Sequence, residues 1–320
     1  MIPNYKKLFI VGCPRSGTTW LARMLSLHPD VIAADSESHA YPLIYDPFTY
    51  LPKWNLQRRF QSKKWLLRNY GLMPLLIGIQ PKHIWHGILR SYKIYQKVNE
   101  VGLHFFVTYA ELQQLVHAVG SKDANDLVKA EYLIAHIFDH FFQRVGGLKG
   151  QTLVEKTPMH IRHVNVILNH FPEAKVIEMI RDGRDVCVSH AALAKGKRWA
   201  SRKNAIDVMC QWKRCIELGE KFRADASIAD RIHSVRYEQL RAHPQDELGQ
   251  IFEFAGLNWS EALRNQIVAE TDISKIKNKG EGLHIRKGTI GDWRTCLSET
   301  ELTLFKQITG ETLEKIGYSW

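Results

Sequence analysis

Short apolar runs alternate with amphipathic stretches at the beginning of the chain. The run KLFIV at residues 7–11 is apolar and partly β-branched, which predicts a buried strand. Residues 18–27 then place apolar side chains at helical spacing, and the predicted helix ends at His28-Pro29. Residues 31–34 predict a second strand. The chain therefore opens with a strand, a loop, a helix and another strand.

The second half of the chain repeats this alternation. Apolar runs at residues 151–154, 174–180 and 233–237 predict three further strands. Thr157 and Pro158 suit the N-cap and first position of a helix. Strands separated by helices predict an α/β fold, with a P-loop-like, three-layer architecture in which helices flank a central parallel sheet. The stripe after Pro158 consists of Ile161, Val164, Ile167 and Leu168, and further helices are expected at residues 184–194, 204–224, 244–255, 260–268 and 298–308.

Residues 41–150 interrupt this alternation. Tyrosine and tryptophan crowd the first half of the stretch, and prolines divide it. Residues 124–145 form one long segment of helical periodicity. We expect a mostly helical, aromatic-rich cap over a substrate site, inserted into a single domain that spans residues 1–320.

The composition is that of a globular protein except for its charge. A chain of 320 residues can form one large α/β domain with a sizeable core, or two small domains. The formal net charge of +11 suits an anionic ligand, an anionic acceptor, nucleic acid or an acidic membrane surface. The 5 cysteines include no Cys-x-x-Cys pair, which argues against a disulfide framework and a thiolate zinc site and fits a reducing compartment.

The sequence contains no recognisable signal peptide or membrane span. Residues 1–7 are polar and lead directly into the first predicted strand. The longest apolar stretch, residues 72–79, contains Pro74 and Gly78 and is too short to cross a bilayer. We therefore expect a soluble, cytoplasmic protein.

The segment between the first strand and its helix has the form of a phosphate-binding loop. Four residues separate Gly12 from Gly17, as in a P-loop, and the loop leads into a helix N-terminus, which attracts phosphate. Thr18 stands where a P-loop has the lysine that holds a nucleoside triphosphate, which argues against a kinase or NTPase. The cation is Arg15 instead, which suits a ligand with one phosphate and one further oxyanion.

The loop sequence Gly-Cys-Pro-Arg-Ser-Gly-Thr-Thr-Trp-Leu at residues 12–21 resembles the 5′-phosphosulfate loop of one enzyme family. These enzymes are the sulfotransferases that use 3′-phosphoadenosine 5′-phosphosulfate (PAPS), and the resemblance extends to their tyrosylprotein, heparan and cytosolic types. It implies a bacterial-type enzyme that transfers a sulfuryl group from PAPS without a required metal. The donor-binding residues that it implies are Arg15, Ser16, Gly17, Thr18, Thr19 and Trp20.

A second segment, at residues 176–189, resembles the 3′-phosphate element of the same family. The arginine and serine of that element match Arg181 and Ser189. Arg181 lies at the end of a predicted parallel strand, where open α/β sheets bind ligands, and Ser189 lies about two turns into the next helix. An arginine and a serine can converge on one phosphate from these positions.

Two further segments carry the resemblance. Residues 285–294 are similar to the R-K-G-x-x-G-D-W signature that closes over the 3′-phosphate, which implies that Arg286, Lys287 and Gly288 bind it. The pattern V-R-Y-E-x-L at residues 235–240 implies that Tyr237 lies near the adenine.

Sulfuryl transfer needs a base for the acceptor proton and cations for the developing charge. The K-T-P segment resembles one in which the lysine stabilises the bridging oxygen of the leaving group, which implies that role for Lys156 beside Arg15. In the tyrosylprotein and heparan types a glutamate base lies near residues 35–39, which implies Glu37. His39 is the alternative base, because cytosolic sulfotransferases use a histidine.

The acceptor stays open at this point, with a lipid, a phenol, another small metabolite and a glycan as candidates. We interpret the basic runs at residues 195–198 and 275–279 as solvated loops, so no nucleic-acid partner is expected. Peripheral membrane contact and the oligomeric state stay open. Two alternative functions are a P-loop nucleotide kinase and a module that binds PAPS or another anion without turnover.

Overall fold

The computed structural model describes residues 4–46, 81–194, 204–273 and 288–320 and divides the chain into two compact units. We call Lys6–Ala33 with Thr152–Trp320 the sheet unit, and Met1–Tyr5 with Ala34–Gln151 the helical unit. The helical unit includes the whole of residues 41–150, the stretch that interrupts the alternating pattern. The prediction of one domain with an acceptor-site insertion stays a prediction.

The sheet unit contains a five-stranded parallel sheet within the described part of the chain. The strands follow the order β2-β3-β1-β4-β5, so β1 lies at the centre between β3 and β4. Because all strands run in one direction, their carboxyl ends meet at one edge of the sheet, where open α/β folds bind ligands. The strand bounds are β1 Lys6–Gly12, β2 Val31–Ala33, β3 Thr152–Lys156, β4 Lys175–Ile180 and β5 Ile232–Arg236.

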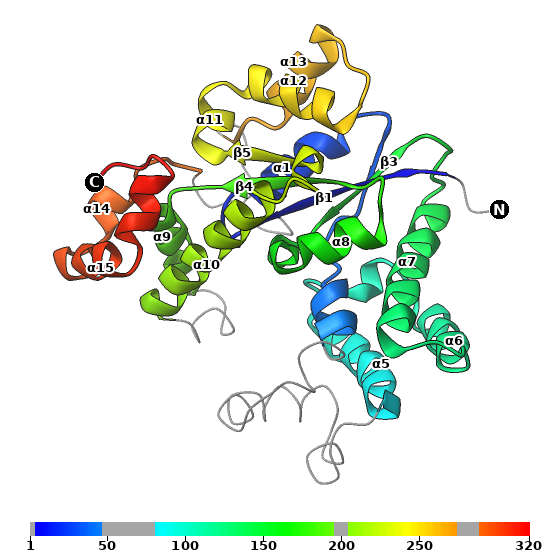
Figure 1. The fold of residues 1–320 in the computed structure, drawn as a ribbon. Coiled ribbons are helices and arrows are strands. Elements are labelled where there is room, and N and C mark those ends of the chain that lie inside the picture. Colours follow the sequence, from blue (N-terminus) through cyan, green and yellow to red (C-terminus); the bar gives the residue numbers. More distant parts are fainter. Residues whose placement is uncertain (1–3, 47–80, 195–203, 274–287) are drawn as a thin grey trace. The chain divides into compact units, whose positions relative to one another are not determined.

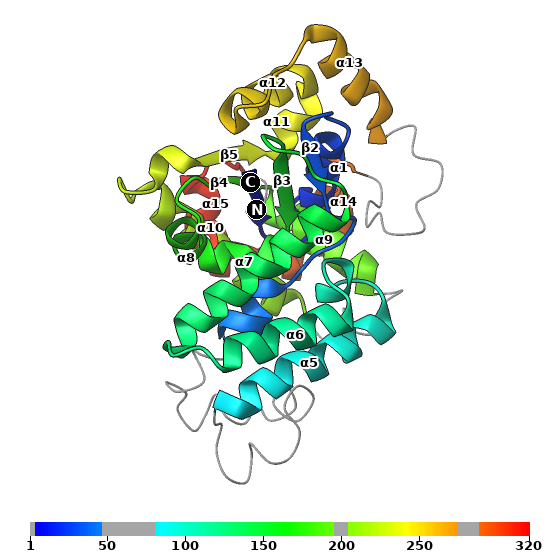
Figure 2. The same cartoon turned by 90° about the vertical axis from the view of Figure 1, so that its right-hand side faces the viewer.

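Successive side chains of a strand point to opposite faces of the sheet, and each face packs against a layer of helices. Leu8 and Ile10 join a buried cluster with helices α1, α11, α12 and α13, whereas Phe9 points to the other face and stacks on Phe171 after α8. Helices α9 and α10 pack together on that second face (Figures 1 and 2). The bounds are α1 Thr18–Ser26, α8 Val164–His170, α9 Gly183–Ala194, α10 Ala205–Arg223, α11 Tyr237–Ala242, α12 Pro244–Ala255, α13 Glu261–Glu270, α14 Trp293–Cys296 and α15 Glu299–Lys315.

These observations confirm the predicted α/β fold with a central parallel sheet flanked by helices. Several local details differ from the expectations. Thr157 and Pro158 do occupy the N-cap and first positions, but the Thr157 hydroxyl makes no cap hydrogen bond; it donates to Glu155 Oε1 at 2.7 Å, because a buried carboxylate needs donors. A 3₁₀ turn, η4 Pro158–His163, precedes α8. Tyr237 begins α11 instead of ending β5, and the last long helix continues to Lys315.

The described part of the helical unit is built from helices. Thr108 and Glu111 form a capping box at the start of α6, and Asn125 caps α7, which confirms the long helical segment predicted at residues 124–145. Residues 47–80, with much of the aromatic run, lie outside the described residues. The helices are η1 Tyr41–Tyr45, α5 Pro81–Val98, η3 Leu103–Phe105, α6 Tyr109–Gly120 and α7 Asp126–Arg144. Fully buried residues of this unit include Tyr41, Phe106, Leu133, Ile137, Phe138 and Phe142.

Among the described residues, no helix combines the length and the apolar character that a membrane crossing requires.

Candidate nucleotide and transfer site

The loop between β1 and α1 has a backbone that only glycine can supply at two positions. Gly12 has φ +142°, and a Cβ atom there would lie 2.4 Å from the Met179 carbonyl oxygen. Gly17 has φ +96°, and its Cβ would lie 2.5 Å from the Tyr237 ring. Both contacts are shorter than real Cβ atoms allow. The two glycines therefore bring the loop directly against β4 and α11.

The same loop presents hydrogen-bond donors at the N-terminus of α1. The first N–H groups of a helix have no partner within it, and the helix dipole adds positive potential there. Ser16 is buried, and its hydroxyl has no hydrogen-bond partner among the described residues. Thr18 is buried beside it. Buried polar groups are nearly always paired, so this loop suits an anionic ligand.

Arg15 and Arg181 join the loop to the second predicted phosphate element. The Arg15 Nε atom donates to Ser189 Oγ, seven residues into α9, at 3.1 Å. Arg181 follows β4 directly and donates from Nη1 to the Arg15 carbonyl oxygen at 3.1 Å. Three residues that were predicted to bind the two phosphates of one nucleotide thus meet at the carboxyl edge of the sheet.

Tyr237 packs against Arg181, and both residues hold the backbone of the segment at residues 285–294, which resembles R-K-G-x-x-G-D-W. The Arg181 guanidinium lies 4.2 Å from the centre of the Tyr237 ring and donates from Nη2 to the Thr289 carbonyl at 3.0 Å. The Tyr237 hydroxyl donates to the Gly288 carbonyl at 3.0 Å. Burial raises the pKa of Tyr237, and the Arg181 charge opposes this shift. Arg181 Nε is buried without a partner among the described residues, so the guanidinium keeps a donor for a ligand.

Of the segment at residues 285–294, residues 288–294 are described, with φ +66° at Gly288, whereas Arg286 and Lys287 lie outside the described residues. The structure therefore brings together the loop at residues 12–21, the segment at 176–189, Tyr237 and the described part of the segment at 285–294.

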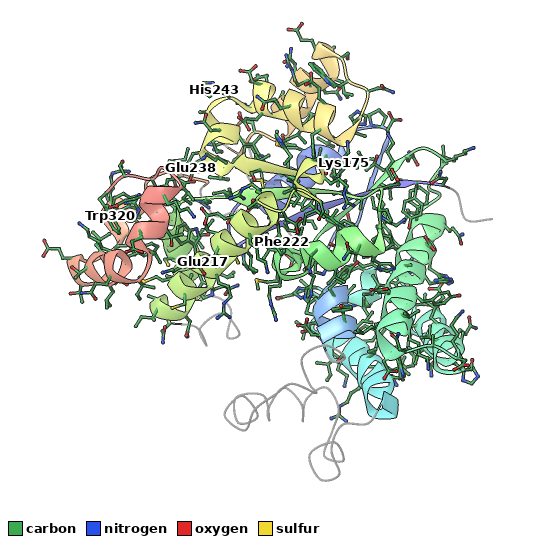
Figure 3. The ribbon with its side chains drawn as sticks, viewed as in Figure 1. Lys175, Glu217, Phe222, Glu238, His243 and Trp320 are labelled. Atoms are coloured by element: carbon green, nitrogen blue, oxygen red, sulfur yellow. The ribbon has the colours of Figure 1, made fainter. Side chains whose placement is uncertain are left out.

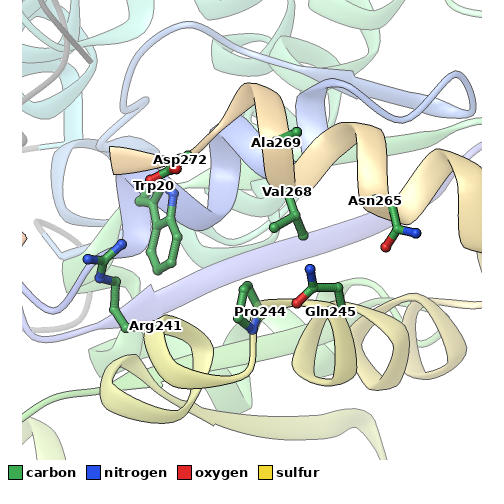
Figure 4. A pocket seen from close by; sticks show the side chains of 8 residues that line it. All are labelled: Trp20, Arg241, Pro244, Gln245, Asn265, Val268, Ala269 and Asp272. Carbon is green, nitrogen blue, oxygen red and sulfur yellow. The ribbon is translucent and has the colours of Figure 1, made fainter. Parts of the chain in front are cut away.

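Trp20 lies at one end of a pocket of about 300 Å³ (Figure 4) and packs against Tyr237. The two rings meet edge to face at 5.9 Å, and the indole Nε1 donates to the Thr271 carbonyl at 2.8 Å. The Arg241 guanidinium lies 5.5 Å from the centre of the Trp20 ring. The lining residues are Trp20, Arg241, Pro244, Gln245, Asn265, Val268, Ala269 and Asp272.

Lys156 is the last residue of β3 and lies opposite Ile10 of β1 in the parallel ladder. Its side chain is buried, as are those of its neighbours. Glu155 accepts a hydrogen bond from the Thr157 hydroxyl, and its carboxylate lies 2.9 Å from His160 Nδ1. This cluster fixes the turn after β3 and hence the backbone that carries Lys156.

The two candidate bases form one pair in the helical unit. His39 Nε2 and Glu37 Oε2 lie 3.1 Å apart, and both side chains are partly exposed. The His39 ring stacks on Tyr95 at 6.2 Å, and the Glu37 carbonyl accepts a hydrogen bond from Gly102 N at 2.7 Å. The sequence could not choose between Glu37 and His39, and the structure makes them hydrogen-bond partners.

Sequence reasoning missed acidic residues that support the site. Glu238, in α11 (Figure 3), accepts the Asp182 N–H at 3.0 Å and the Tyr318 hydroxyl at 2.7 Å. Asp185 accepts two N–H groups from residues 291 and 293. Burial is the main cause that raises the pKa of each of these two carboxyls. The two aspartates of the R-D-G-R-D sequence at the end of β4 were the available signal.

The model of the sulfotransferase family matches residues 7–261. Curated relatives include a protein-tyrosine sulfotransferase of Drosophila melanogaster and protein-tyrosine sulfotransferase 1 of Danio rerio, each 24% identical over 259 residues. Each match covers 80% of this chain but only 39% and 54% of the respective relative, so the chain spans about half or less of their length.

Solved structures share the fold. The sulfotransferase domain of the Synechococcus PCC 7002 olefin synthase is 21% identical with a TM-score of 0.52, over 99% of this chain and 97% of that one. The mouse sulfotransferase SULT7A1 complexed with PAP, 3′,5′-bisphosphoadenosine, is 15% identical with a TM-score of 0.53, over 97% and 85%.

Proposed function

The chain belongs to the sulfotransferase family, and we propose that it transfers a sulfuryl group from PAPS to an acceptor hydroxyl. One observation carries this proposal. Arg15, Ser189 and Arg181 come from three separate parts of the chain and meet through hydrogen bonds of 3.1 Å beside a helix N-terminus. A nucleotide with anionic groups at both its 5′ and 3′ positions matches such a paired cationic site.

The proposed donor site divides into three parts. The loop with Arg15 and Ser16 binds the 5′-phosphosulfate through its side chains and the N–H groups of α1. Arg181 and Ser189 bind the 3′-phosphate. Trp20 supplies an aromatic surface for the adenine, next to Tyr237. The absence of a P-loop lysine at Thr18 supports this ligand over a nucleoside triphosphate.

In the proposed transfer, the acceptor oxygen attacks sulfur in line with the bond to the bridging oxygen. A new S–O bond forms as the bond between sulfur and the 5′-phosphate oxygen breaks, which leaves 3′,5′-bisphosphoadenosine. Lys156 stabilises the negative charge that develops on the leaving oxygen, and Arg15 stabilises the charge on the sulfuryl oxygens. Glu37 accepts the proton of the acceptor hydroxyl.

The Glu37–His39 pair supports a division of labour between the two candidate bases. A carboxylate that accepts a hydrogen bond from an imidazole N–H is held in one orientation by it. We assign Glu37 as the base and His39 as the residue that orients it.

A phenolic hydroxyl is the acceptor class that the comparisons support first, because the curated relatives are named protein-tyrosine sulfotransferases. The formal charge of +11 supports an acceptor with acidic neighbours. A lipid, another small metabolite or a glycan hydroxyl would replace this class if phenols and tyrosine peptides were not sulfated. The cytoplasmic location stays a prediction.

Calorimetric titration tests the donor site. We expect wild-type protein to bind 3′,5′-bisphosphoadenosine with a Kd in the micromolar range or below, and Arg181→Ala to weaken it by tenfold or more, since a charge-assisted hydrogen bond contributes about 1.5–3 kcal/mol. Tighter binding of ATP with Mg²⁺ would support the kinase alternative. Binding without sulfuryl transfer to any phenol, tyrosine peptide, lipid or glycan from labelled PAPS would support the non-catalytic module.

A further inference from the structure

The backbone of residues 288–293, which we call the 288–293 loop, is anchored to the proposed 3′-phosphate site. Its first two carbonyl groups accept hydrogen bonds from the Tyr237 hydroxyl and from Arg181 Nη2, each at 3.0 Å. Arg181 therefore depends on this loop for one of its hydrogen bonds, and the ring on which Arg181 stacks depends on it as well.

Asp185 holds the other end of the 288–293 loop. Its Oδ2 atom accepts the N–H of Gly291 at 2.8 Å, and Oδ1 accepts the N–H of Trp293 at 3.1 Å. Asp185 is 2% exposed and lies in the first turn of α9, where the helix dipole favours a carboxylate. One buried side chain thus fixes two backbone positions of a loop that is about a hundred residues away in sequence.

Arg184 and two tryptophan rings pack at the end of the loop that Asp185 holds. The Arg184 guanidinium is buried, 3.7 Å from the centre of the Trp293 ring and 5.1 Å from that of Trp320. Its Nη2 atom donates to Asp182 Oδ2 at 2.7 Å and to the Ser319 carbonyl at 2.8 Å. Arg184 thus connects the Trp320 ring to Trp293, the residue that ends the loop.

We infer that Asp185 and Trp320 are positioning residues for the 3′-phosphate: they hold the 288–293 loop, which in turn holds Arg181 and Tyr237. Neither residue is assigned a contact with the nucleotide. This inference rests on the proposed function, because it concerns the site of the PAPS 3′-phosphate.

The physical reason is preorganisation. A free arginine side chain must lose rotational freedom when it binds a phosphate, whereas Arg181 is already held by the Arg15 and Thr289 carbonyls and by the Tyr237 ring. If the 288–293 loop loosens, binding of the 3′-phosphate must order it. Binding of the 5′ group at the N-terminus of α1 does not require that ordering.

The test compares two nucleotides that differ only in the 3′-phosphate. Calorimetry would measure the Kd of 3′,5′-bisphosphoadenosine and of adenosine 5′-monophosphate for each variant. Asp185→Asn keeps the shape of the side chain but turns an amide N–H toward a backbone N–H. We expect it to weaken the bisphosphate by about tenfold and the monophosphate by less than about twofold. Trp320→Ala should weaken the bisphosphate by about threefold.

Two controls separate positioning from folding. Trp320→Phe keeps an aromatic ring beside Arg184 and should restore bisphosphate binding to within about twofold of wild type. Trp259→Ala removes a tryptophan whose ring lies 4.8 Å from the Arg264 guanidinium, away from the loop, and should leave both Kd values unchanged. Thermal unfolding would confirm that each variant is folded at the titration temperature.

The outcomes distinguish the positioning roles of Asp185 and Trp320 from the proposed 3′-phosphate site. Equal losses for both nucleotides, or none for either, in Asp185→Asn and Trp320→Ala would overturn the inference and leave the proposed function intact. Wild-type protein that binds the bisphosphate no more tightly than the monophosphate would contradict the proposed 3′-phosphate site itself, and the positioning roles would fall with it.

Discussion

The loops at the carboxyl edge of the sheet and the core of the helical unit place different demands on their residues. At Gly12 and Gly17 a positive φ and a close approach leave room for glycine alone. In the helical unit, buried residues such as Phe138 and Phe142 need to be large and apolar, and many sequences meet that need. Short motifs can therefore identify the loops at the sheet edge, whereas the core of the helical unit carries no comparable motif.

Glu37 gives the strongest test of this contrast. As the proposed base, it would be a residue of the helical unit at which one particular chemical group is required. We expect Glu37→Gln to lower kcat by about 10²–10⁴-fold, since the base is lost, while the Kd of 3′,5′-bisphosphoadenosine changes by less than about twofold. Steady-state kinetics with labelled PAPS would measure this. Glu111→Gln, in the α6 capping box, is the matched control and should keep full activity. A larger loss in His39→Gln than in Glu37→Gln would reverse their roles.

Lys156 tests the same contrast from the sheet unit. Lys156→Ala should lower kcat by about 10²–10³-fold, because charge on the leaving oxygen loses its cation, while bisphosphate affinity changes by about threefold or less. Lys175→Ala is the control: this lysine begins β4 and donates to the Phe254 carbonyl (Figure 3). Equal rates for Lys156→Ala and wild type would remove Lys156 from the mechanism.

A pair of glycine substitutions compares the two regions directly. Gly17→Ala should cost about 2–4 kcal/mol of stability or abolish bisphosphate binding, because its Cβ meets the Tyr237 ring at a positive φ. Gly120→Ala, at the end of α6 with open space around it, should be neutral or stabilise by up to about 1 kcal/mol. Denaturant unfolding would measure both. Similar costs at the two sites would contradict the steric argument.

The smallest effect concerns pH. Burial and the nearby Lys7 charge lower the pKa of His170 from 6.5 to about 4. A lowered histidine pKa favours the neutral form in the folded state, so its stability contribution is complete above pH 6.5 and is lost as the pH falls toward 4. We expect about 1–2 kcal/mol less stability at pH 5 than at pH 7 from this residue. Urea unfolding of wild type and His170→Asn would show it as a flatter pH dependence in the variant, and parallel curves would contradict it.

The sequence predicted most of the fold because strands and helices depend on local periodicity. All five strands of the described sheet and the helices α1, α7, α9, α10 and α12 lie within one or two residues of their predicted ranges. The errors occurred where tertiary partners decided the outcome. Thr157 has a residue type that commonly caps helices, but its hydroxyl donates a hydrogen bond to the buried Glu155 carboxylate instead of accepting one from the start of the helix.

For the candidate site, the sequence by itself determined which residues could bind phosphate: Arg15 in a glycine loop before a helix, and Arg181 with Ser189 after a second strand. Only the tertiary structure decided that these residues meet, that Glu37 and His39 are partners, and that Asp185 holds a loop from the far end of the chain. A motif fixes local backbone conformation and residue type within a few residues. Contacts between segments separated by a hundred residues or more depend on the strand order of the sheet, which brings the carboxyl ends of β1 and β4 side by side.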